Sequence, residues 1–227
     1  MEVKLVIDRL RSLGDPKAVE GMTRFGIQSS NSFGVSVPQL RTLASEVGRD
    51  HMLAMKLWET GLHDARLLAT MVDDPRKVTL EQMDKWVRDF DSWDVVDGSC
   101  GNLFDKTPFA VAKAKQWCKR EEEFVKRAGF VMMAELAVHD KEAKDKVFLD
   151  FLPLIVGGAS DERNFVKKAV NWALRQIGKR NMKLNKAAVS TARRIRKIDS
   201  GAAKWVAADA LRELKSPQVL KRLRKTK

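Results

Sequence analysis

Phe165-Val-Lys-Lys-Ala169 repeats Phe124-Val-Lys-Arg-Ala128 at a distance of 41 residues, and Ala210-Leu-Arg212 repeats Ala173-Leu-Arg175 at a distance of 37 residues. Strong helix formers dominate these strings and the residues around them. A period near 40 residues that is built from helix pairs is typical of α-solenoids, in which each pair buries its apolar side against the next pair. The repeat therefore predicts a stack of helical pairs.

Helical signals extend from this repeat over the whole chain. Apolar residues recur at spacings of three and four, and alternating β-branched runs are absent. We therefore expect an all-α protein, a single domain over residues 1–227 that forms a curved α-solenoid of HEAT-like repeats with a concave basic face. Helix breakers fall at Gly14-Asp15-Pro16, Pro38, Gly61, Asp74-Pro75, Thr107-Pro108, Pro153, Gly157-Gly158, Ser200-Gly201 and Ser216-Pro217.

Positive charge is concentrated toward the C-terminal end of the sequence. Residues 162–227 hold twenty Lys and Arg against four acids, and the formal net charge of the whole chain is +13. A one-sided cationic surface attracts polyanions, of which nucleic acid is the commonest. We expect the basic half to begin near residue 162 and to end in a flexible basic tail over residues 217–227.

Other features of the sequence restrict the class of protein. The chain has two cysteines and three histidines, and it lacks both the glycine-rich nucleotide loops and the His-Glu-x-x-His motif. It has no apolar run near eighteen residues and no signal-peptide pattern. We expect a monomer in a reducing cytoplasm, without a cofactor, a metal or a membrane partner.

The helix expected from Arg163 to Lys179 has two stripes at a spacing of i, i+4, i+7 and i+11. The apolar stripe, which suits packing, consists of Val166, Val170, Ala173 and Ile177. The other stripe combines three cations with one aromatic ring and consists of Lys168, Trp172, Arg175 and Lys179. A nucleic-acid surface can use such a face, since the ring packs on a sugar or a base while the cations hold phosphates. The alternative is that Trp172 fills a gap between helices and the cations are merely solvated.

The nearly apolar segment from Phe124 to Val138 predicts an inner helix, which Arg127 interrupts. A cation on an inner helix needs a carboxylate, a carbonyl or a bound anion as its partner. A phosphate in a groove and a salt bridge to an acid are both open for Arg127. The candidate acids are Glu122, Glu123 and Glu135.

A carboxylate candidate lies in Asp91-Ser-Trp-Asp-Val-Val-Asp97-Gly-Ser-Cys-Gly101. Trp93 and Asp97 fall at i and i+4, on one face of the expected helix. The small residues after Asp97 let another backbone or a ligand approach closely. An aromatic ring beside a carboxylate and a cleared space suggests a pocket. The alternative is that Asp97 pairs with a basic side chain or with a backbone N–H.

Four strings occur in order along the chain: Phe33-Gly-Val-Ser-Val-Pro-Gln-Leu-Arg41, Ser92-Trp-Asp-Val-Val-Asp97, Phe124-Val-Lys-Arg-Ala128 and Lys168-Ala-Val-Asn-Trp-Ala-Leu-Arg175. Together these strings resemble the DNA alkylation repair family, the AlkD-like DNA glycosylases built from HEAT-like repeats. The resemblance extends from about Ser32 to about Leu214. Family members often carry a doubled tryptophan before the aspartate, whereas this chain has Ser92 in the first of these places.

The resemblance implies a DNA glycosylase of base excision repair, which releases N3- and N7-alkylated purines from duplex DNA and associates with the nucleoid through that DNA. It assigns the catalytic role to Asp97, contact with the lesion to Trp93 and Trp172, and a place in the DNA groove to Arg127. The basic stripe of Lys168, Arg175 and Lys179 would hold phosphates. Two alternatives remain. One is a non-catalytic module for damaged, bent or branched duplex DNA, and the other is a HEAT-like scaffold for acidic proteins or an RNA- or ribosome-associated factor.

Overall fold

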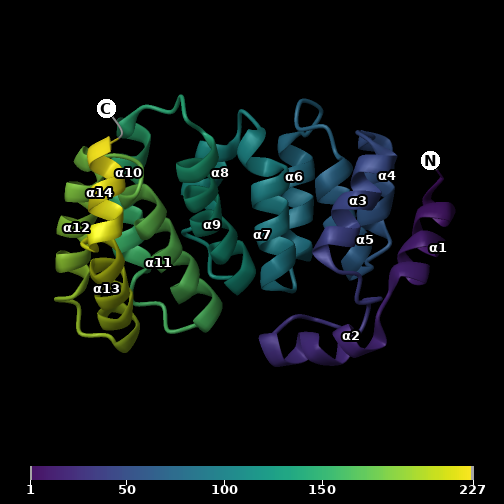
Figure 1. Ribbon diagram of the computed structural model, residues 1–227, viewed down its shortest axis with the longest axis horizontal. Coiled ribbons are helices and arrows are strands. Elements are labelled where there is room, and N and C mark those ends of the chain that lie inside the picture. Colours follow the sequence, from purple (N-terminus) through teal and green to yellow (C-terminus); the bar gives the residue numbers. More distant parts are fainter. Residues whose placement is uncertain (1, 226–227) are drawn as a thin grey trace. The chain divides into compact units, whose positions relative to one another are not determined.

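The computed structural model describes residues 2–225, and every regular element in that range is a helix (Figure 1). The prediction of an all-α protein is confirmed. Contacts group the helices into two compact units, residues 1–107 and residues 108–227, which are described in turn. None of the described helices has the length and apolar character that crossing a lipid bilayer requires.

The first unit is organised around α5, which packs against α3, α4 and α7. Its core contains the indole rings of Trp58 and Trp86, which are stacked with their centroids 3.9 Å apart. The elements of this unit are α1 (Val3–Leu13), α2 (Pro16–Met22), η1 (Thr23–Phe25), α3 (Val37–Val47), α4 (His51–Glu59), α5 (His63–Val72), α6 (Leu80–Trp86), η2 (Val87–Asp89), α7 (Trp93–Asn102) and η3 (Phe104–Lys106).

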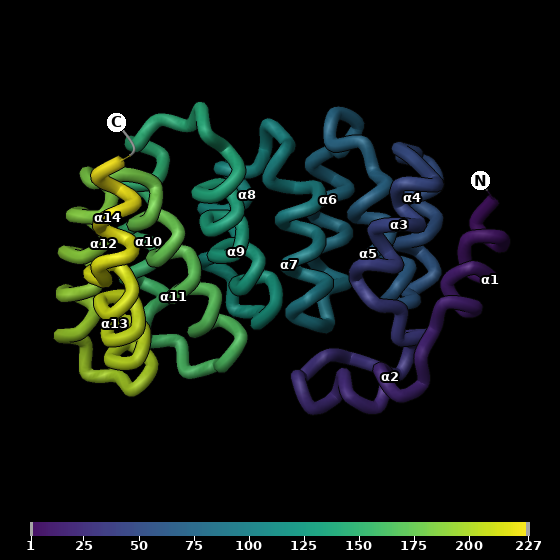
Figure 2. Tube along the Cα trace, in the orientation of Figure 1, coloured from purple at the N-terminus to yellow at the C-terminus, as the bar shows by residue number. Residues whose placement is uncertain are grey.

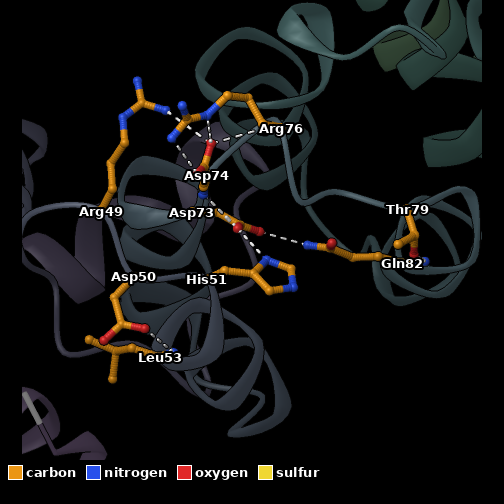
Figure 3. A network of polar contacts seen from close by, with 9 residues as sticks. All are labelled: Arg49, Asp50, His51, Leu53, Asp73, Asp74, Arg76, Thr79 and Gln82. Carbon is orange, nitrogen blue, oxygen red and sulfur yellow. Dashed lines mark hydrogen bonds and ion pairs between the residues drawn. The ribbon is translucent and has the colours of Figure 1, made fainter.

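A polar network connects α4, α5 and α6 within this unit (Figure 3). The buried carboxylate of Asp73, at the end of α5, accepts hydrogen bonds from His51 Nδ1 and Gln82 Nε2, each at 2.7 Å. It also accepts a hydrogen bond from the backbone N–H of Asp74, and the carboxylate of Asp74 forms an ion pair with Arg76. A buried carboxylate is costly unless its oxygens are satisfied. The network therefore fixes the ends of three helices relative to one another.

The second unit is a stack of helix pairs, as the repeat predicts. The pairs α8–α9, α10–α11 and α12–α13 each pack internally; α9, α11 and α13 form one row, and α8, α10 and α12 form the other. Helix α14 packs on α12 and α13 (Figure 2). The elements are α8 (Ala110–Trp117), α9 (Glu123–His139), α10 (Asp145–Gly158), α11 (Asn164–Gly178), α12 (Met182–Ile195), α13 (Gly201–Leu214) and α14 (Pro217–Lys225).

The two copies of the sequence repeat meet in space at the start of α9 and α11. The rings of Phe124 and Phe165, which occupy equivalent positions in the repeat, have centroids 5.7 Å apart. Farther along α9, a Cβ atom on Gly129 would lie 2.2 Å from the backbone nitrogen of Cys118. Only glycine allows α8 and α9 to approach this closely.

The structure corrects one expected helix break. Pro153 lies inside α10, on its exposed side. Proline in a helix interior costs about 3 kcal/mol, because it removes one hydrogen bond and crowds the preceding turn. Burial of a large apolar side chain contributes roughly 1.5–3 kcal/mol, so the buried side of α10 offsets that cost. The buried apolar side chains are Phe148, Phe151, Leu152 and Ile155.

Residues 217–225, expected as part of a flexible basic tail, form α14. Val219 and Leu223 are buried on one side of this helix, and its other side chains are mostly basic. Residues 226 and 227 of the expected tail lie outside the described residues.

Candidate functional site

The start of α7 carries Trp93 and Asp97, one helical turn apart and both half-buried. The Asp94 carboxylate between them accepts a short hydrogen bond from the hydroxyl of Ser92 and another from the N–H of Val95 at 3.0 Å. A carboxylate at this position satisfies a free N–H group and interacts favourably with the positive end of the helix dipole. Asp94 therefore fixes the first turn of α7, which carries Trp93 and continues into the turn that carries Asp97.

His63, at the start of α5, holds the other oxygen of Asp94. Its Nε2 lies 2.8 Å from Asp94 Oδ2, and the imidazole is buried. Burial alone would lower the pKa of His63, but the hydrogen bond and charge of Asp94, with the charges of Asp64 and Asp91, raise it above its ordinary value. Burial likewise opposes ionisation of Asp94, yet His63, Ser92 and the Val95 N–H lower the pKa of this carboxyl. The pair clamps the start of α7 to the start of α5.

A second contact orients the Trp93 ring. Its Nε1–H donates to the carbonyl oxygen of Phe25 at 2.9 Å, at the end of η1. The chain reverses there at Gly26, whose φ of 70° is accessible at low cost to glycine. Phe25 itself is 71% exposed. Trp93 is therefore held by backbone from a segment 68 residues earlier in the chain.

The small residues after Asp97 serve helix packing. A Cβ on Gly98 would lie 3.0 Å from Leu67 Cδ2, and Asn102 Nδ2 donates to Thr70 Oγ1 at 2.9 Å. Ser99 is buried. The sequence predicts that these small residues admit either another part of the protein or a ligand. At Gly98 the structure shows close approach of another helix, α5, through the side chain of Leu67.

Arg127 lies on α9 in the second unit and is only 5% exposed. Its Nη1 donates to the carbonyl oxygen of Phe165 at 2.7 Å, near the start of α11. A carbonyl is one of the three partner types expected for a cation on an inner helix. The contact links the two repeat copies, since Phe165 is the first residue of the second copy.

The apolar stripe of α11 is confirmed, since all four of its side chains are fully buried. On the other stripe, Arg175 Nη1 lies 2.6 Å from Glu213 Oε2, and Lys179 Nζ lies 2.7 Å from Glu213 Oε1. Arg175 also lies 3.6 Å from Asp209 Oδ2. Both acids belong to α13, so two of the three predicted phosphate-binding cations have acidic partners within the protein.

The start of the same stripe is more accessible. Lys168 is exposed and forms no ion pair with any residue in the range that the structure describes, and Trp172 is half-buried. Beside them, Lys167 Nζ lies 5.5 Å from the ring centre of Trp205, which is 42% exposed. An exposed indole next to cations extends the aromatic and basic character of α11 onto α13.

Several of these residues are missing from the sequence-based site. The role of Asp94 had a local signal in the sequence, because Ser92 lies at the N-cap of α7 and Asp94 is an acidic residue in its first turn. Glu213 and His63 had none, since their contacts join residues 38 and 31 positions apart. Trp93 and Asp97 belong to the first unit, whereas Arg127, Lys168, Trp172, Arg175 and Lys179 belong to the second.

Residues 6–214 match the sequence model of a family described as DNA alkylation repair enzyme. The chain belongs to this family. A solved structure from "a new family of proteins related to the HEAT-like repeat DNA glycosylases with affinity for branched DNA structures" superposes with a TM-score of 0.77 at 20% identity, over 94% of this chain and 96% of that one. The expected HEAT-like fold is confirmed by this likeness.

Two curated relatives of the chain are described as uncharacterised proteins. They are Lin0241 of Listeria innocua serovar 6a and Lmo0209 of Listeria monocytogenes serovar 1/2a, each 25% identical over 130 residues. The match covers 56% of this chain and 58% of each relative. The chain thus spans somewhat over half the length of the curated relatives it matches.

Proposed function

We propose that this protein is a DNA glycosylase that releases N3- and N7-alkylated purines from duplex DNA. In this proposal Asp97 is the catalytic carboxylate, and Trp93 and Trp172 contact the lesion nucleotide. Arg127, which is buried and donates to the Phe165 carbonyl, acts by holding the start of α11 in place for DNA binding. Lys168 binds a phosphate directly, while Arg175 and Lys179 do so by exchanging Glu213 for DNA. Membership of the DNA alkylation repair family supports a repair function on DNA.

The observation that carries the proposal is the fixed start of α7. Asp94 and His63 hold its first turn, and the Phe25 carbonyl holds the Trp93 ring, so Trp93 and Asp97 project from a rigid element. A catalytic carboxylate needs such support, because small displacements from the productive geometry cost much of the rate. Binding of phosphates alone would not require a supported tryptophan and aspartate.

Release of an alkylated purine requires few catalytic groups from the protein. An alkylated purine carries a positive charge, so when the bond from the sugar C1′ to the base nitrogen breaks, the electron pair leaves with the base and neutralises it. Oxocarbenium character then develops on the sugar, and a carboxylate can stabilise it. Water adds to C1′ and gives its proton to Asp97, which leaves an abasic site. The face of an indole ring such as that of Trp93 attracts a cationic base.

The test is base release from methylated duplex DNA, with the products identified by mass spectrometry. The Asp97→Asn variant should lose release of N7-methylguanine and N3-methyladenine while it retains its DNA affinity. Asp8→Asn, which neutralises an exposed aspartate on α1, is the matched control and should behave as wild type. Equal release by Asp97→Asn and wild type would remove Asp97 from the mechanism.

A second candidate function is a non-catalytic module for branched or bent duplex DNA. It is favoured by the HEAT-like solved structure, whose family is described as having affinity for branched DNA. Buried Ser92, in place of the first tryptophan of the family pattern, is the feature of this chain that agrees with it. This function predicts tight binding of four-way junctions and no base release by the wild-type protein.

A further inference from the structure

Much of the positive charge of the second unit that lacks an acidic partner lies on α12 and in the turn after it, whereas two of the three cations on the stripe of α11 are paired. Arg175 and Lys179 on α11 share the carboxylate of Glu213. The basic residues of α12 and the turn after it are exposed, and among the described residues only Lys183 has an acidic partner, Asp145 at 3.6 Å. The cations without such a partner include Lys186, Arg193, Arg194 and Lys197.

These cations lie on one face of α12, which we name the outer face and define as Lys183, Lys186, Arg193, Arg194 and Lys197. The first four recur at i, i+3, i+10 and i+11, and Lys197 follows in the next turn. At 1.5 Å per residue, the helical part spans about 17 Å. That length corresponds to about five base steps of duplex DNA at 3.4 Å each.

The outer face and the stripe of α11 lie on different helix rows of the second unit, each on the side of its helix away from the buried side chains. Helices α11 and α12 pack against each other. Helix α14 packs on α12 (Figure 2), and its exposed cations include Lys221, Arg224 and Lys225.

The residue types on the outer face favour duplex DNA over other polyanions as its ligand. Membrane-binding amphipathic helices insert an apolar side, but the apolar side of α12 is already buried in the core: Leu184, Ala188, Ala192 and Ile195. Single strands are held by aromatic stacking, and α12 contains no aromatic residue. A regular row of cations without aromatic residues matches the phosphates of a duplex.

We propose that the outer face is a second binding site for duplex DNA, so that one molecule holds two duplex segments, one on each helix row of its second unit. The choice of DNA as the ligand rests on the function proposed above. The outer face takes no part in base release.

A bridging assay tests the second site. One 20-base-pair duplex is fixed to beads, a second is fluorescent, and the protein is added below saturation. Wild type should capture the fluorescent duplex. K186Q/R193Q/R194Q/K197Q should reduce capture at least about tenfold, and the salt dependence of capture should fall by roughly 3 to 4 units of slope. Release of methylated bases from a single duplex should stay at the wild-type rate.

Two further variants control for a general loss of positive charge and for a loss of helix stability. K4Q/K17Q/K56Q/K77Q removes four exposed cations of the first unit and should bridge as wild type. Arg193 and Arg194 lie in the last turn of α12, where cations also stabilise the helix. K183Q/K186Q, at the other end of α12, should therefore reduce the salt slope by about 2 units without lowering the melting temperature.

Three results would overturn the second site. The first is undiminished bridging by the fourfold α12 variant, and the second is equal loss of bridging in the control of the first unit. The third is outer-face binding of phosphatidylserine vesicles or single-stranded RNA in preference to duplex DNA. A protein that bridges duplexes but releases no base would retain the second site and refute the glycosylase proposal alone.

Discussion

Arg175 on α11 and Glu213 on α13 form an ion pair with Nη1 and Oε2 2.6 Å apart. The other oxygen of the same carboxylate accepts Lys179 Nζ at 2.7 Å. The carboxylate of Glu213 thus forms ion pairs with two cations that the sequence analysis predicts to bind DNA phosphates. A phosphate that reaches this part of α11 competes with Glu213.

Replacing Glu213 with glutamine should strengthen DNA binding. The amide keeps the size of the side chain but removes the negative charge, so Arg175 and Lys179 become available to phosphates. We expect roughly 3- to 10-fold tighter binding of a plain duplex at moderate salt, and a salt slope steeper by about 2 units. Fluorescence anisotropy over a series of salt concentrations measures both quantities.

Glu59→Gln is the control, because it likewise removes the carboxylate partner of a cation, Lys85 at 3.0 Å, but in the first unit and on a more exposed surface. It should leave affinity and slope unchanged. If Glu213→Gln also leaves them unchanged, Arg175 and Lys179 do not contact DNA.

The His63–Asp94 pair should make stability depend on pH. The pKa of His63 is raised in the folded state, so its contribution is complete below the ordinary histidine pKa of about 6.5 and is lost as pH rises through the folded value. The pKa of Asp94 is lowered, so its contribution is lost only in acid. The pair therefore stabilises the fold most between about pH 4 and pH 6.5.

Melting temperatures of wild type and His63→Gln from about pH 4 to pH 9 measure the effect. The difference between them should be largest near pH 5 to 6 and should shrink above neutrality. A difference that is constant from pH 5 to pH 9 would mean that His63 does not carry the charge assigned to it.

Gly129→Ala should destabilise the protein. The new methyl group would meet the backbone of Cys118 at 2.2 Å, and backbone cannot move aside as a side-chain tip can. We expect a loss of about 1–3 kcal/mol in the free energy of unfolding, measured by urea denaturation. Gly157→Ala is the control, since nothing lies within 4 Å of that Cβ and the residue is inside α10. It should gain about 0.5–1 kcal/mol, and a loss there would contradict the packing argument.

The Trp93→Phe variant should distinguish the effect of an aromatic ring at this position from the effect of the hydrogen bond that orients the ring. Phenylalanine keeps an aromatic face but cannot donate to the Phe25 carbonyl. We expect base release to fall several-fold through kcat, with a loss of about 0.5–1.5 kcal/mol in stability for the missing hydrogen bond. Trp205→Phe, on the exposed side of α13, should retain kcat. Equal kcat for Trp93→Phe and wild type would show that the contact with Phe25 does not position the ring.

The sequence was sufficient for the fold class and for the register of individual helices. The spacing of Val166 and Val170 placed the buried side of α11 correctly, because helical periodicity is a local property that a few side chains determine. The repeat of Phe124 at Phe165 predicted that successive pairs stack, and the two rings are in contact. Pro153 was misjudged because burial along the rest of α10 outweighs a local helix-breaking preference.

Only the tertiary structure decided how the candidate site residues are partnered. The spacing of Trp93 and Asp97 makes them candidates, but the contacts that hold the start of α7, from Phe25 to Trp93 and from His63 to Asp94, come from other elements. Glu213 neutralises Arg175 from 38 residues away. The charge of the basic segment is a matter of composition, whereas the place where it remains unpaired depends on which helices meet. Contacts between distant residues arise from packing of whole helices, and local spacing carries no record of them.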